Sequence, residues 1–204
     1  MPVPALINAL VLAMTVLAYG PYIRDILRGQ TKPHAMTWCT ATLTAFVVYG
    51  LQALGGAGIG ALPVLFVGTL CACIFLLSLY YGTADRAAVD VIFLLLSLSA
   101  LALWLLAERP IVSVLLITAS EILGYAPTMR KSWRDPRSET LSLYAVNALR
   151  QGLSILALER VNLLTTLYPA AWAVANLVIA GILILGRRRE RDSSRRSPLA
   201  EPGR

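Results

Sequence analysis

Apolar residues fill seven long stretches of the chain, each bounded by charged residues, glycine or proline. Their approximate ranges are 4–24, 35–54, 61–82, 88–107, 110–129, 139–158 and 162–186. Each has about the 20 residues that an α-helix needs to cross a bilayer. Because helices satisfy their own backbone hydrogen bonds in lipid, the pattern predicts an all-α integral membrane protein with seven transmembrane helices.

The composition supports this prediction and orients it. Hydrophobic residues make up 57% of the 204 residues and charged residues only 14%. Fifteen of the 18 lysine and arginine residues fall on one side of the predicted helices. This excess predicts a multi-pass protein of the cell inner (plasma) membrane, with the N-terminus outside and the C-terminus in the cytoplasm. It also favours contact with anionic lipids over nucleic acid as the reason for the net charge of +7.

One segment of the chain occurs twice, at an offset of 106 residues. The matching residues are Tyr19, Pro21, Arg24 and Arg28 in the first copy and Tyr125, Pro127, Arg130 and Arg134 in the second. Pro63 and Pro169 match at the same offset, and each is expected to open a helix.

The repeat divides the chain into four parts. Residues 1–82 form a first three-helix unit, 83–108 a linker transmembrane helix, and 109–186 a second three-helix unit. The unpaired linker gives both units the same orientation, so they are parallel repeats in a 3+1+3 arrangement. Residues 187–204 form a basic cytoplasmic tail that is predicted to be disordered.

This plan, with a proline near the end of the first helix of each unit and a basic loop after it, resembles the PQ-loop superfamily. It is closest to SWEET- and SemiSWEET-type carriers and bacterial PQ-loop proteins, over nearly all of residues 5–186. The dipeptides read Pro21-Tyr22 and Pro127-Thr128 here. The resemblance implies sugar transport, with Asn176 close to the family's third-helix asparagine and Gln52 near a second-helix pocket position.

Two charged residues lie inside predicted spans. Glu121 is near the middle of the fifth and Arg150 near the middle of the sixth. Charges at that depth are unfavourable and are by default hypotheses about function. Two roles remain open: a structural ion pair, or a Glu121 that takes up a proton or contacts the solute. The matching residues of the first unit are Thr15 and Thr44, so either role is asymmetric.

Polar residues also follow one face of the sixth span: Thr140, Tyr144, Asn147, Gln151 and Ser154. Lipid cannot solvate such a stripe, so it is expected to face the interior of the bundle. In the seventh span Trp172 and Asn176 share a face, where a ring and an amide could bind a sugar. Packing and interhelical hydrogen bonding are the alternatives. The predicted solute site joins the residues Asn147, Gln151, Trp172 and Asn176 to Gln52 and Thr69 of the first unit.

Pro21 and Pro127 are candidate hinges of a cytoplasmic gate, because proline removes a backbone hydrogen bond and bends or breaks a helix. The alternative is that each merely ends its helix before the loop that follows.

The favoured function is therefore a carrier of a small polar solute, with sugar first, working by alternating access between the two units. The alternatives are a proton-coupled exporter of an amino acid or cationic metabolite, and a non-transporting receptor or assembly factor. An enzyme is not expected, because HExxH, GxSxG and phosphate-loop motifs are missing from the sequence. Neither a cofactor nor a metal is expected, and the oligomeric state is open.

Overall fold

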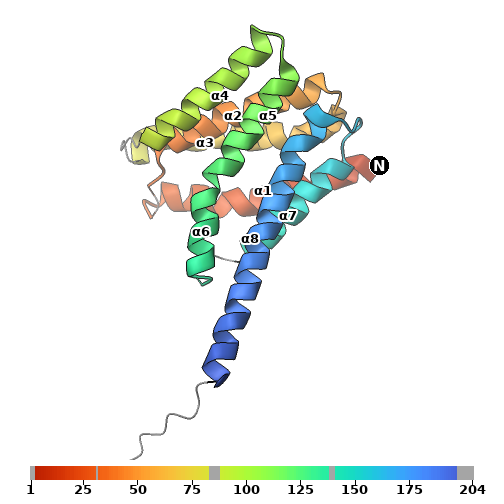
Figure 1. Cartoon of the computed structure of the whole chain (residues 1–204). Helices are drawn as coiled ribbons and strands as arrows, with labels where there is room; N and C mark the ends of the chain where they lie inside the picture. Colours follow the sequence, from red (N-terminus) through yellow and green to blue (C-terminus); the bar gives the residue numbers. More distant parts are fainter. Residues whose placement is uncertain (1–2, 31, 83–87, 138–140, 197–204) are drawn as a thin grey trace, which may run out of the picture.

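The computed structural model describes residues 3–30, 32–82, 88–137 and 141–196, and the elements in this part of the chain are helices joined by short turns (Figure 1). Its elements are α1 (Val3–Leu27), α2 (Ala35–Leu54), the 3₁₀ turn η1 (Gly58–Ala61), α3 (Leu62–Tyr81), α4 (Ala88–Leu105), α5 (Pro110–Gly124), α6 (Ala126–Arg134), α7 (Leu141–Leu156) and α8 (Leu163–Arg196). The all-helical prediction is confirmed for these residues, and each of the seven apolar stretches is helical.

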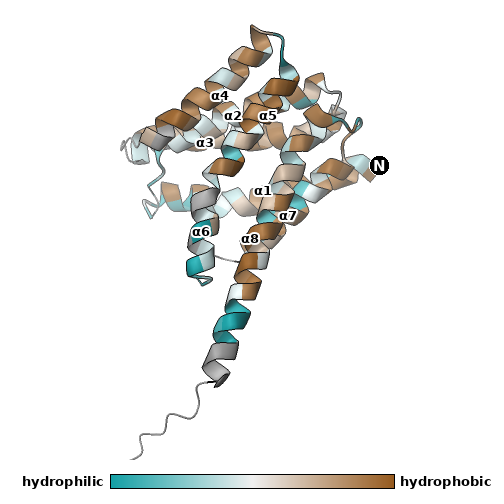
Figure 2. Cartoon of the chain, in the orientation of Figure 1, coloured by the Kyte–Doolittle hydropathy of each residue, from teal (hydrophilic) through white to brown (hydrophobic). Residues whose placement is uncertain are grey.

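Five segments are long and apolar enough to cross a membrane, judged by length and composition. They are Val3–Leu27, Ala35–Leu54, Gly58–Tyr81, Pro110–Arg134 and Leu163–Arg191. Within the described residues the other two predicted spans are shorter: the apolar part of α4 is Val91–Leu105, and α7 has 16 residues. Apolar residues run along most of the helices, whereas hydrophilic residues occur in α6 and in α8 just beyond its apolar part (Figure 2). The chain thus has the pattern of a multi-pass membrane protein.

The helices pack as two groups of three with the same order of neighbours. In the first group α3 contacts both α1 and α2, and in the second α8 contacts both α5 and α7. In the repeat α1 corresponds to α5 and α2 corresponds to α7. Between the groups, α1 packs against α7 and α5 packs against α2, so the two contacts are equivalent. Helix α4 lies against α2 and α5.

An aromatic contact recurs in the two groups. The rings of Tyr19 and Trp38 have centroids 6.3 Å apart at 71° between planes. Those of Tyr125 and Tyr144 are 6.4 Å apart at 66°. Both members of one pair are 106 residues from their counterparts, so the offset found in the sequence relates two contacts of closely similar geometry.

The sequence predicts that the matching prolines mark equivalent helix ends. The structure does not show this equivalence. Helix α1 continues through Pro21 to Leu27, with Pro21 exposed. Pro63 lies in the first turn of α3 as predicted, but Pro169 is inside α8. Helix α8 starts earlier because the Asn162 side chain caps it, accepting hydrogen bonds from the first backbone N–H groups.

The predicted fifth span is interrupted at one residue, Tyr125, whose backbone stays in the helical region at φ −82° and ψ −15°. Helix α5 ends at Gly124. The N–H of Tyr125 donates to the carbonyl of Ile122, three residues earlier, at a distance of 3.1 Å, which is a tighter turn than the four-residue spacing of an α-helix. Pro127 then occupies the second position of α6, where the missing N–H has no intrahelical partner to lose. A helix break therefore accompanies the proline of the second group and not that of the first.

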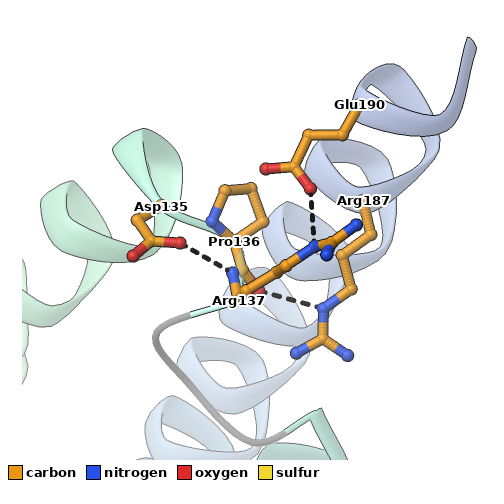
Figure 3. Close-up of polar contacts among 5 residues, drawn as sticks. All are labelled: Asp135, Pro136, Arg137, Arg187 and Glu190. Carbon is orange, nitrogen blue, oxygen red and sulfur yellow. Dashed lines mark hydrogen bonds and ion pairs between the residues drawn. The ribbon is translucent and has the colours of Figure 1, made fainter. Parts of the chain in front are cut away.

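Helix α8 extends well beyond its apolar part and is held to the segment that follows α6 (Figure 3). Nε of Arg187 donates to the carbonyl of Pro136 at 2.9 Å, and Arg137 pairs with Glu190 at 3.0 Å. We call these contacts the α6–α8 clamp. Helix α8 continues through residues 187–196, where the sequence predicts a disordered tail. Residues 197–204 lie outside the described part.

The α2–α3 and α7–α8 turns are joined by four hydrogen bonds, which we call the loop clasp. The bonds run from Asn162 Nδ2 to Gly55 O (2.7 Å), Gln52 Nε2 to Thr165 O (3.0 Å), Ile59 N to Glu159 Oε1 (3.1 Å) and Glu159 N to Ala57 O (3.1 Å). The two turns occupy equivalent places in the two groups, so the clasp ties the groups together at one end.

Candidate functional site

A central cavity of about 320 Å³ lies where the two groups of helices meet. Its size is within the range of small-molecule sites. The first group contributes residues of α1, α2 and α3, among them Tyr19, Thr37, Trp38, Thr44, Pro63, Val67 and Cys71. The second contributes Glu121, Tyr125, Asn147, Arg150, Gln151, Ser154, Tyr168, Trp172 and Asn176. Most of the polar and all of the charged lining comes from the second group.

Glu121 and Arg150 both line this cavity, and both are partly buried. The Tyr168 hydroxyl donates a hydrogen bond to Glu121 Oε2 at 3.2 Å. Among the described residues, no ion pair within 4.0 Å joins Glu121 to Arg150. The structural ion pair, one of the two predicted roles, is therefore not formed in this conformation, and both charges are presented to the cavity.

The polar stripe of α7 faces inward over most of its length. Asn147, Gln151 and Ser154 line the cavity, as predicted. Tyr144 is instead buried in an apolar cluster with Ile179. Thr140, the first residue of the predicted stripe, lies outside the described residues. The stripe supplies two side-chain amides that a bound solute can reach.

Trp172 and Asn176 also line the cavity, but they differ in what they offer a ligand. The Asn176 amide donates to the Trp172 carbonyl at 2.7 Å and accepts from the Tyr125 hydroxyl at 3.4 Å. In the described part of the chain, Nε1 of Trp172 is buried without a hydrogen-bond partner. The Trp172 ring packs edge-on to Tyr125 with centroids 4.8 Å apart. Trp172 is therefore the better binding candidate, and Asn176 holds its neighbours in place.

Two predicted site residues do not belong to the cavity. Gln52 is 1% exposed and takes part in the loop clasp, beyond the end of the cavity along α2. Thr69 is exposed, and its hydroxyl donates to the carbonyl of Leu65 at 3.0 Å. Val67 and Cys71 do line the cavity, and a helix turns about 200° over two residues, so Thr69 points the opposite way.

The sequence interpretation missed three aromatic residues of the cavity: Tyr19, Trp38 and Tyr168. The repeat carried a signal for two of them, because Tyr19 corresponds to Tyr125 and Trp38 to Tyr144. Tyr168 precedes Trp172 by four residues, which places both on one face of α8. Their ring centroids are 6.3 Å apart.

The two candidate hinges differ in the backbone around them. Pro21 is exposed on α1, which is continuous there, whereas Pro127 follows the break between α5 and α6. Only the second of these positions has the interrupted backbone expected of a hinge.

Within the described residues, no group of three or more histidine, cysteine, aspartate or glutamate side chains could hold a metal ion. The cysteines Cys39, Cys71 and Cys73 are free thiols.

Comparison of the chain with protein-family models, with curated proteins and with solved structures found no match. The cavity and its residues are therefore the features of this chain that indicate a function.

Proposed function

We propose that this protein is a membrane carrier that moves a small polar solute by alternating access between two parallel three-helix units. The units are α1–α3 and α5–α8, with α5 and α6 counted as one interrupted helix and α4 as the linker. The observation that carries the proposal is the central cavity between the units, lined by amides, charges and aromatic rings inside apolar helices. Such groups are unfavourable in a membrane interior unless a solute or water uses them.

The two ends of the cavity support alternating access. At one end the loop clasp ties the units together with four hydrogen bonds. At the other end α5 is interrupted next to Tyr125, which lines the cavity. A hydrogen bond contributes about 1 kcal/mol net, so the clasp is weak enough to open in a transport cycle. The arginine distribution assigns the clasp to the outer side of the membrane and the break to the cytoplasmic side.

A non-transporting receptor or assembly factor is the main alternative. Such a protein needs no solvent-accessible interior and could have a packed, dry core. The polar cavity of about 320 Å³ favours the carrier over this alternative.

Sugar is the first candidate solute. The ring of Trp172 and the amides of Asn147 and Gln151 lie in one cavity, and they provide the stacking surface and hydrogen-bonding groups that a sugar uses. The resemblance to SWEET-type carriers supports the same choice.

An amino acid is the second candidate, and a specific observation favours it. Glu121 and Arg150 face one cavity with opposite charges and without pairing. A zwitterion can place its ammonium near the carboxylate and its carboxylate near the guanidinium. In this case Glu121 also becomes the candidate for proton coupling.

The test is counterflow in proteoliposomes with labelled sugars and amino acids at two pH values. We expect exchange of one class, and we expect Asn147→Leu and Trp172→Ala each to reduce it about tenfold, the effect of losing roughly 1.4 kcal/mol of solute binding. Leu149→Ala is the control, because Leu149 is on the same helix and 57% exposed.

Wild-type exchange in both cavity variants would refute the proposed site. Silence across the whole panel would instead favour a receptor or assembly factor.

A further inference from the structure

A second hollow lies beside the central cavity, between α2, α4 and α5. It has a volume of about 310 Å³ and is more open than the central cavity, and we call it the side chamber. Thr40 of α2, Phe93 of α4 and Ser120 of α5 line the side chamber but not the central cavity. Helix α4, which the repeat treats only as a linker, therefore forms part of a wall.

The two hollows meet at the same side chains. Glu121, Tyr125 and Trp172 line both of them. Arg150 lines the central cavity alone, and no basic side chain is among the described residues around the side chamber. The central cavity thus presents charges of both signs, whereas the side chamber presents only a carboxylate.

Three aromatic residues line the side chamber together with this carboxylate. Phe93 packs directly on Gly124: a Cβ atom at position 124 would lie 3.1 Å from Cζ of the ring. The absence of a side chain at Gly124 therefore allows the Phe93 ring to pack there and to line the side chamber. Tyr125 and Trp172 complete the aromatic lining, with their ring centroids 4.8 Å apart.

The side chamber also contains a hydroxyl group that lacks a partner. Thr40 is only 9% exposed, and its Oγ1 makes no hydrogen bond within the described part of the chain. The Ser120 hydroxyl donates to the carbonyl of Ile117 at 2.9 Å, which leaves its oxygen able to accept. A buried hydroxyl is unfavourable without a hydrogen bond, so Thr40 points to a polar group of a ligand or to water.

From these contacts we propose that the side chamber is a binding site for a small organic amine in its protonated form. The ammonium group lies at Glu121 and donates to the hydroxyls of Thr40 and Ser120. The apolar body of the amine packs against Phe93, Tyr125 and Trp172. Aromatic faces attract a cation, and a carboxylate in apolar surroundings is stabilised by a cation that remains beside it.

The charge of the chamber separates this ligand class from others. An anion would be repelled by Glu121, because no basic residue of the described lining offsets it. A neutral polyol would leave the carboxylate unpaired and would place hydroxyls against aromatic rings. The site goes beyond the proposed carrier function, and amine binding can be measured whether or not the protein transports a solute.

The experiment measures binding to the full chain in lipid nanodiscs by isothermal titration calorimetry. Phenethylamine is the probe, and 2-phenylethanol is its neutral counterpart of nearly the same shape. We expect the amine to bind at least about tenfold more tightly than the alcohol, because a desolvated cation–π contact and a charged hydrogen bond each contribute this order of affinity. Glu121→Gln should remove the difference between the two probes.

Two further variants locate the site. Phe93→Ala and Thr40→Val should each weaken amine binding about threefold or more, because they remove an aromatic face and a hydroxyl acceptor. Thr40→Val is nearly isosteric and keeps the fold testable if Phe93→Ala does not fold. Phe46→Ala is the matched control, since Phe46 is 40% exposed and lines neither hollow.

Three results would overturn the assignment. Equal binding of amine and alcohol would show that the chamber takes an apolar, lipid-like occupant. Amine binding that is unchanged by Thr40→Val and Phe93→Ala but lost in Asn147→Leu would place the site in the central cavity. No binding of the amine to the wild-type protein would exclude the proposed ligand class.

Discussion

The two groups of helices share their packing but differ in their chemistry. Both have the third helix between the other two, and both have an edge-on aromatic pair of nearly the same geometry. At the place of Glu121, however, the first group has Thr15, which is fully buried and donates within its own helix to the carbonyl of Val11 at 2.8 Å. The repeat thus maintains a scaffold of apolar and aromatic contacts, and the charges that line the central cavity come from the second group.

The same contrast holds for the second pair of corresponding residues. Thr44 shares a hydrogen bond of 3.1 Å with Ser97 of α4, whereas Arg150 bonds to none of the described residues. A threonine can satisfy its hydroxyl locally, but a guanidinium with five donors cannot do so in an apolar helix. The side chain that the scaffold leaves unsatisfied is the one that a solute can use.

The largest effect on solute exchange is expected when the cavity charges, which distinguish the second group from the first, are removed. Glu121→Gln and Arg150→Gln should each reduce solute exchange about tenfold or more, because a hydrogen bond to a charged group contributes about 1.5–3 kcal/mol. Thr15→Val should change exchange less than about twofold, since it removes only a bond internal to α1. Counterflow in proteoliposomes measures all three. Equal losses in the three variants would show that the two groups contribute alike.

A smaller effect is expected at the two prolines. Pro127→Ala restores an N–H at the break and should favour a continuous α5–α6 helix, which we expect to slow exchange about threefold to tenfold. Pro21→Ala should leave exchange nearly unchanged and raise the thermal stability, because proline inside a helix is less favourable than alanine by up to about 3 kcal/mol. Counterflow and thermal unfolding separate the two outcomes. If Pro21→Ala slows exchange as much as Pro127→Ala, the hinge is symmetric.

The smallest effect is expected at the α6–α8 clamp of the second group. Arg137 and Glu190 are exposed at 73% and 39%, so their ion pair is screened by water and salt. Arg137→Ala should lower the free energy of unfolding by at most about 1 kcal/mol, and less at high salt. Arg188→Ala is the control, as Arg188 is exposed and outside the clamp. A loss of several kcal/mol would mean that the clamp is a main support of α8.

The sequence predicted the helices well, because spans in a membrane are governed by one strong signal. The seven apolar stretches became helices, and the inward stripe of Asn147, Gln151 and Ser154 is confirmed. Helix ends were less predictable, since they depend on local contacts such as the Asn162 cap and the turn at Tyr125. A proline in the sequence does not reveal whether the backbone around it breaks.

The cavity was only partly predictable. Residues on strongly polar faces were placed correctly, whereas Gln52 was not, because a buried amide serves the loop clasp as well as it would serve a ligand. Tyr168 was missed, because an aromatic residue in an apolar stretch gives no signal of its own. The side chamber could not be predicted from the sequence, since Phe93 and Gly124 are brought together by the packing of α4 on α5.

Helix α8 has 34 residues, which at 1.5 Å per residue is a rod of about 50 Å. The hydrocarbon core of a bilayer is only about 30 Å thick, so a substantial part of the rod projects beyond it. Since the same helix carries Trp172 and Asn176, the part that projects beyond the bilayer is continuous with the wall of the central cavity. A small tilt of the second group would therefore produce a larger displacement at this end of α8. A fluorophore or spin label near Arg191 would report that displacement in real time.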